Sequence, residues 1–203
     1  MANRTYLYAE RPREDGTTQL IDVAECASDV PLAYQLLCSI NTERVPSKIV
    51  DDTATDEETG ETLSPLAIRA SFTAGREALF RFMERFAEVN SKNLHLPEDS
   101  VAEEFASTRN ELLDERFAGC THFWMEPFEV YSLVADSFSD FSARAEATFR
   151  DTIAAEDRTT SILDIWESGD FDEHGSAQEL FYSLGFGTWS KILYFHFPDD
   201  SEK

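Results

Sequence analysis

One stretch of the chain places apolar residues at helical intervals, and this periodicity constrains the fold more than any other feature. The residues are Ile68, Phe72, Leu79, Phe82 and Phe86, at intervals of four, seven, three and four. Such spacing puts them on one face of an α-helix, which must be buried. Ser64 suits an N-cap and Pro65 a first helical position, so we expect a long helix from Ser64. Gly75 lies on the same stripe and predicts close packing there.

Weaker patterns of the same kind predict shorter helices along the rest of the chain. They cover residues 29–41, 97–112, 127–134, 140–153 and 177–184. Proline near the start of several of these segments, and acids in the first turn after Pro97, support these starts. Residues 162–166 fit either a strand or a helix.

Three short segments read as strands because they are rich in β-branched and aromatic residues. They are residues 5–8, 47–50 and 189–197. We expect the first and last to pair, so that the two ends of the chain form a small sheet. The predicted fold is α+β and mostly helical, with antiparallel helices packed on that sheet. A length of 203 residues fits a single domain over 1–203.

The charge balance bears on partners. The chain has 40 acidic and 17 basic residues, a formal net charge of −23. Such a field repels nucleic-acid phosphates and anionic membranes, so we expect neither as a direct partner and favour a basic protein instead. Solubility alone would also explain the acidity.

The acids concentrate in three places, which we predict as partner-binding surface. Residues 51–64 are expected to form a mobile acidic loop, and the other two places are one helix face and a turn. The candidates are Asp51, Asp52, Asp56, Glu57, Glu58, Glu103, Glu104, Glu111, Asp170, Asp172 and Glu173. The same residues suit a merely solvated surface. Four arginines, Arg69, Arg76, Arg81 and Arg85, predict one basic ridge that can pair internally with acids.

Motifs for chemistry are weak. Asp170, Asp172 and His174 resemble the front of a calcium loop, but Phe181 stands where a bidentate glutamate is needed, so an ordinary turn is the better interpretation. Cys120 and His122 lack a second ligand pair at zinc spacing. There is no nucleophile elbow. We therefore expect no catalytic residue, cofactor or metal.

The cysteines and the first residues bear on the compartment. Three cysteines, Cys26, Cys38 and Cys120, form no disulfide framework and favour reduced thiols. The chain starts without the apolar stretch of a signal peptide, and no apolar run reaches the length of a membrane span. We expect a cytoplasmic protein.

Several segments resemble an uncharacterised family of bacterial proteins. They are the opening Met1-Ala-Asn-Arg-Thr-Tyr-Leu-Tyr8, residues 29–34, the phenylalanine-rich segment after Leu66, and Trp189-Ser-Lys-Ile-Leu-Tyr-Phe195. Members begin Met-Ala-Asn-Arg-Ser-Tyr-Leu-Tyr and end near Trp-Ser-x-x-Leu-Tyr-Phe. The resemblance implies a bacterial cytosolic protein of about this size and carries no activity. Small acidic proteins of this kind are similar to the immunity partners of secreted toxins.

These observations favour a non-enzymatic acidic protein that neutralises a cognate bacterial toxin by covering its basic surface. Two alternatives remain open. One is a metal-assisted hydrolase that uses Asp170, Asp172 and His174. The other is a nucleic-acid mimic, whose carboxylates would be spaced like phosphates and would block a DNA-binding protein.

Overall fold

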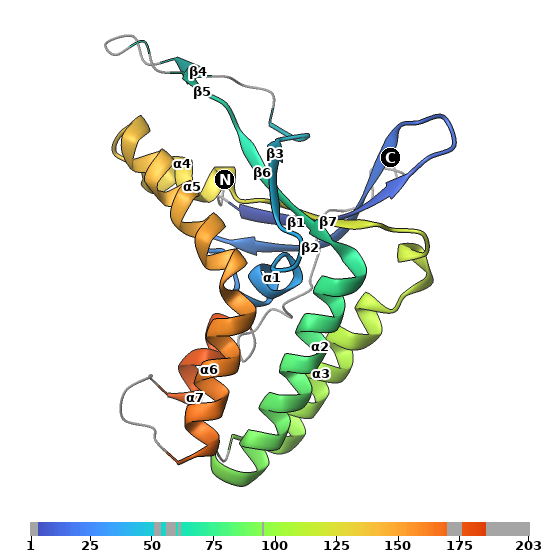
Figure 1. The fold of residues 1–203 in the computed structure, drawn as a ribbon, viewed down its shortest axis with the longest axis vertical. Helices are drawn as coiled ribbons and strands as arrows, with labels where there is room; N and C mark the ends of the chain where they lie inside the picture. Colours follow the sequence, from blue (N-terminus) through green and yellow to red (C-terminus); the bar gives the residue numbers. More distant parts are fainter. Residues whose placement is uncertain are drawn as a thin grey trace, which may run out of the picture.

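The computed structural model describes residues 4–50, 54–55, 60, 62–94, 96–169 and 176–185. There, a five-stranded antiparallel sheet with the order β2-β1-β7-β6-β3 lies across packed helices, in the upper part of Figure 1. Its strands are β1 (Arg4–Pro12), β2 (Thr18–Ala27), β3 (Glu43–Pro46), β6 (Leu66–Ser71) and β7 (His122–Glu126). A separate small hairpin joins β4 (Ala54–Thr55) to β5 (Thr62–Leu63). The fold is α+β, as the sequence predicts.

The described residues form seven α-helices, and several of them start where the sequence predicts. They are α1 (Leu32–Leu37), α2 (Phe72–Val89), α3 (Glu98–Leu112), α4 (Phe128–Val134), α5 (Phe138–Ile153), α6 (Ala155–Glu167) and α7 (Ala177–Ser183). A π-helical turn, Asn90–Leu94, extends α2, and a 3-10 turn, Glu115–Phe117, follows α3. The open choice for residues 162–166 is resolved as helix, within α6.

Strand alternation divides the sheet residues between two faces. Leu7 and Ala9 of β1, with Phe123 and Met125 of β7, are fully buried in the core beneath the sheet. Because successive side chains of a strand point to opposite faces, the intervening residues point away from that core. The second face therefore carries the more polar set, including Glu10.

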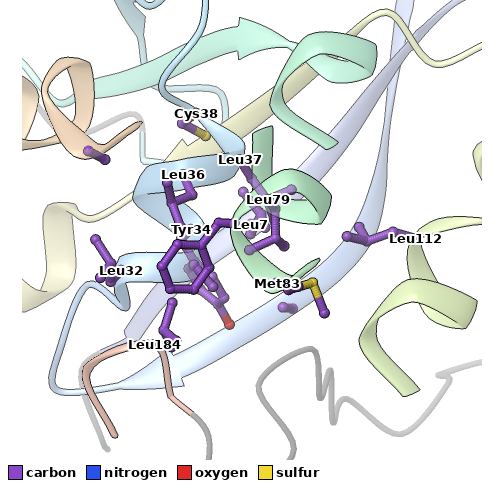
Figure 2. Close-up of a cluster of buried hydrophobic side chains, with 14 of the residues drawn as sticks. Leu7, Leu32, Tyr34, Leu36, Leu37, Cys38, Leu79, Met83, Leu112 and Leu184 are labelled. Atoms are coloured by element: carbon purple, nitrogen blue, oxygen red, sulfur yellow. The ribbon is translucent and has the colours of Figure 1, made fainter. Parts of the chain in front are cut away.

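The core lies between the sheet and the helices, with α1 at its centre. Figure 2 shows Tyr34 of α1 near Leu32 and Leu184, with Leu7 of the sheet and Met83 of α2 close by. The side chain of Tyr34 is fully buried. The stripe Phe72, Leu79, Phe82 and Phe86 is buried along α2, as its spacing predicts.

The close packing expected at Gly75 is confirmed. A Cβ atom built on this glycine would overlap the carbonyl oxygen of Leu37, at the end of α1. The contact is with backbone, so it cannot relax by a side-chain rotation. Gly75 therefore allows α1 and α2 to approach each other directly.

Arginines of α2 hold it against α6, so the basic ridge is not an open cationic surface. Arg81 pairs with Glu156 at 2.7 Å, and Arg85 pairs with Asp164 and Glu167. Arg76 donates to the carbonyl oxygen of Leu112. The predicted internal pairing is confirmed for Arg81 and Arg85.

Four structural predictions are wrong. Residues 66–71 form β6 rather than helix, and α2 starts at Phe72 with Ser71 as its cap. Residues 47–50 form bends after β3 rather than a strand, and residues 122–126, for which the sequence predicts no strand, form β7. The sheet is formed by N-terminal and central strands. Residues 6–8 of β1 pair with β2 on one side and with β7 on the other. Both sides are therefore occupied, and the predicted pairing of these residues with a C-terminal strand is wrong. Residues 189–197 themselves lie outside the described residues.

Candidate functional site

A group of charged side chains gathers on the face of the sheet that points away from the core. We call it the Glu10 cluster: Glu10 of β1, Lys48 of the 47–50 segment, Arg69 of β6 and His122 of β7. Strand register creates it, because Glu10 lies opposite His122 in the β1–β7 pair and Arg69 lies one strand further on. Lys48 reaches in from the segment after β3.

Glu10 is the centre of this cluster. Its carboxylate is only 4% exposed and accepts from Lys48 Nζ at 2.7 Å and from Arg69 Nε at 2.7 Å. Burial raises the pKa of the carboxyl, but the hydrogen bonds from both cations outweigh it and hold the pKa below its ordinary value. Arg69 also pairs with Glu43 at 2.5 Å, which ties β3 to the cluster.

The neutral ring of His122 is held in one tautomer. Arg69 Nη2 lies 2.9 Å from His122 Nδ1, and a guanidinium can only donate, so Nδ1 accepts and the proton of the neutral ring lies on Nε2. Thr121 Oγ1 lies 2.8 Å from the same nitrogen. Burial and the neighbouring Arg69 lower the pKa of His122 below its ordinary value.

The 47–50 segment covers the centre of this face. The backbone N–H of Lys48 donates to Glu126 Oε1 at 3.0 Å, and its ammonium lies 4.1 Å from the centre of the Trp124 ring. Trp124 Nε1 donates to the same Glu126 oxygen at 2.6 Å. Both Trp124 and Glu126 are consequently buried, at 3% and 1% exposure. Glu126 Oε2 has no hydrogen-bond partner among the described residues.

This arrangement stabilises the sheet and is poorly placed for proton transfer. Each oxygen of Glu10 is engaged by a cation, and the acceptor nitrogen of His122 is engaged by Arg69. A general base needs an available lone pair that faces a substrate. The Glu10 cluster therefore reads as a structural ion-pair network that fixes β1, β3, β6 and β7 in register.

The second feature of the molecule, after the Glu10 cluster, is a groove beside β3 and β6. It has a volume of about 380 Å³ and separates the β3–β6 edge of the sheet from α4 and α5. That volume lies in the range of small ligand pockets. The lining residues are Arg44, Thr62, Ser64, Leu66, Ala67, Ile68, Pro127, Tyr131, Phe141, Ser142, Ala145, Glu146 and Phe149. Most of these walls are aliphatic or aromatic.

The charged lining residues form a pair. Arg44 of β3 makes an ion pair with Glu146 of α5 and lies 4.2 Å from the centre of the Phe149 ring. The Glu146 side chain is still 44% exposed, so its carboxylate faces solvent as well as Arg44. Leu66 is 43% exposed, a large apolar side chain that the fold leaves open to solvent. The groove thus combines apolar walls with one acidic group that solvent can reach.

Three of the eleven predicted partner-binding residues lie in the described part of the chain, all of them on α3. Glu103 of α3 is exposed, Glu104 is half-buried, and Glu111 makes an ion pair with Arg116. The structure thus places Glu103 where a partner could contact it. The remaining candidates, Asp51, Asp52, Asp56, Glu57, Glu58, Asp170, Asp172 and Glu173, lie outside the described residues, as does His174.

No metal centre and no membrane span is found in the described ranges. Their His, Cys, Asp and Glu side chains include no group of three or more that could hold a metal ion. The helices of the same ranges are all too short or too polar to cross a bilayer. Burial raises the pKa of Cys120 and raises that of Cys26 to about 11, so neither thiol is activated.

Sequence reasoning missed both features described above. The alternation of Tyr6, Tyr8 and Glu10 with Leu7 and Ala9 continues past the predicted strand end and could have placed Glu10 on a sheet face. The groove has no such signal, because its walls come from segments that are distant in the sequence.

Comparison with protein families matches residues 9–165 to a family described as Domain of unknown function (DUF7822). No curated protein and no solved structure matches the chain.

Proposed function

Because the chain belongs to the family described as Domain of unknown function (DUF7822), whose description assigns no activity, we propose a function from its charges. The protein is a non-enzymatic acidic binding protein that covers a basic surface of another protein. Its most specific form is an immunity protein that neutralises a cognate bacterial toxin in the cytoplasm.

One observation carries this proposal: the cations of the described residues are largely used internally. Ion pairs engage Arg4, Arg44, Lys48, Arg69, Arg81, Arg85, Lys92, Arg109, Arg116, Arg144 and Arg158. With a net charge of −23, the charges that remain for a partner are mainly carboxylates. Such a surface attracts cations from a distance and speeds the encounter with a basic partner.

The Glu10 cluster supports the non-enzymatic part. Its carboxylate and imidazole are engaged by neighbouring side chains, and its cations are engaged by Glu10 and Glu43. Acid–base catalysis would need one of these groups to face a substrate.

The test is a pull-down with the product of the neighbouring gene at low and high salt. We expect a complex at low salt that weakens as salt screens the acidic field. Co-expression should also restore growth to cells that the neighbouring product harms. Failure to form a complex at either salt, or a neighbouring product that is harmless when expressed alone, would remove the proposal.

A further inference from the structure

We propose that the groove between the β3–β6 edge and α5 takes a large apolar side chain of a basic partner, beside an arginine or lysine that pairs with Glu146. This inference rests on the proposed function and adds where the partner docks and what it inserts. Hot spots of protein interfaces are commonly side chains that fill such pockets.

The walls select the apolar part of this occupant. Phe141 and Tyr131 close the groove on the helix side, with exposures of 8% and 6%, and Ile68 closes it on the sheet side. Leu66 stands exposed at the same groove, so an apolar side chain would cover surface that is now in water. A volume of about 380 Å³ admits an aromatic or long aliphatic side chain.

The charges at the groove favour a cationic residue of the partner next to the inserted apolar side chain. Among the described lining residues, one carboxylate faces solvent, that of Glu146, and the one cation, Arg44, is already paired with it. The Arg44 guanidinium lies over the Phe149 ring, so this site already accommodates a guanidinium between an aromatic face and a carboxylate. A second cation can approach the exposed side of Glu146. An apolar ligand that carries an acidic group would instead be repelled by a chain with a net charge of −23.

The same field argues against a second copy of this chain as the occupant. Two molecules with a charge of −23 each repel one another at low salt. A groove filled by self-association should therefore be seen at high salt and not at low salt, which is opposite to the salt dependence of a basic partner.

Two variants block the groove, and each has a matched control on the same kind of surface. Ala145→Phe places a ring in the groove, whereas Ala143→Phe places it on an exposed position of the same helix that does not line the groove. Leu66→Asp changes an exposed groove residue, and Leu113→Asp makes the same change at an exposed leucine elsewhere. Thermal unfolding identifies any variant that is misfolded.

The first measurement is the affinity of each variant for the neighbouring gene product. We expect Ala145→Phe and Leu66→Asp to bind at least about tenfold more weakly, and both controls to bind as the wild type does. Wild-type binding that survives both groove variants would overturn the inference and leave the proposed function intact.

The second measurement does not need that partner. Amide chemical shifts of the labelled protein are followed as a short arginine-rich peptide with one central phenylalanine is added, and then with alanine in its place. Shifts that depend on the phenylalanine and centre on Leu66 and Ala145 support the inference, even if the gene product does not bind. An absence of such shifts, shifts elsewhere, or groove shifts that follow protein concentration at high salt instead would overturn it.

Discussion

Gly75 of α2 rests directly on the backbone of Leu37 of α1: a Cβ atom at position 75 would overlap the Leu37 carbonyl oxygen and lie 2.8 Å from its carbonyl carbon. Two helices that are separate in the sequence are thereby locked at backbone distance, at the centre of the core beneath the sheet.

Gly75→Ala should destabilise the protein by about 1–3 kcal/mol, because the added methyl group overpacks a backbone contact. An exposed helix position would respond in the opposite direction, since alanine is favoured over glycine by about 1 kcal/mol in a helix interior. Urea unfolding measures the change, and Thr73→Ala, an exposed position of α2, is the control. A Gly75→Ala variant as stable as the wild type would show that α1 and α2 can separate without cost.

Glu10→Gln should destabilise the protein by about 2–3 kcal/mol, because it leaves Lys48 and Arg69 facing a neutral amide. The loss is smaller than for a fully buried pair because the two cations are 33% and 27% exposed. Glu77→Gln, on the exposed side of α2, should stay within about 0.5 kcal/mol of the wild type. Equal effects of the two substitutions in urea unfolding would contradict the role given to the Glu10 cluster.

We expect titration of His122 to lower the free energy of unfolding in mild acid. Its folded pKa is lowered below 6.5, so the unfolded chain takes up this proton at a higher pH than the folded one. The stabilising contribution is complete above about 6.5 and decreases as the pH falls toward the folded pKa. His122→Asn keeps an acceptor for Arg69 and Thr121 but does not titrate.

The measurement compares melting temperatures of the wild type and His122→Asn from about pH 8 to about pH 5. We expect the wild type to lose stability relative to the variant as the pH falls, while titration of the other groups cancels in the difference. A difference that does not change with pH would contradict this assignment.

Ser71→Ala should cost about 1 kcal/mol, because the Ser71 hydroxyl accepts from the Ala74 N–H and caps α2. Ser64→Ala should leave stability within about 0.5 kcal/mol, since Ser64 is exposed and precedes a strand. Chemical denaturation of both variants would reveal which serine begins the helix. The opposite ranking would contradict the observed start of α2.

The misplaced start of this helix shows how far periodicity can guide an interpretation. Ile68 and Phe72 are both buried beneath the sheet, one from β6 and one from the first turn of α2. Their spacing of four therefore fits a single helix although the backbone changes between them. Periodicity identified the buried residues correctly and could not identify the backbone that buries them.

β7 was missed for a different reason. Phe123 and Met125 face the core, but Trp124 and Glu126 on the opposite face are buried as well, beneath the 47–50 segment. A strand covered on both faces loses the alternation of polar and apolar residues that identifies strands. The Glu10 cluster was missed for the same reason. His122 lies next to Glu10 because β7 pairs with β1, and β7 was not predicted.

The cover that Lys48 provides has a spectroscopic consequence. Trp124 is buried on the outer face of the sheet, beneath that ammonium, and Trp166 is buried in the core on the inner face. With Trp189 replaced by Phe, two further variants that each keep one of these indoles would report separately on the two faces. Loosening of the 47–50 segment would shift Trp124 emission to longer wavelength while Trp166 kept its native spectrum.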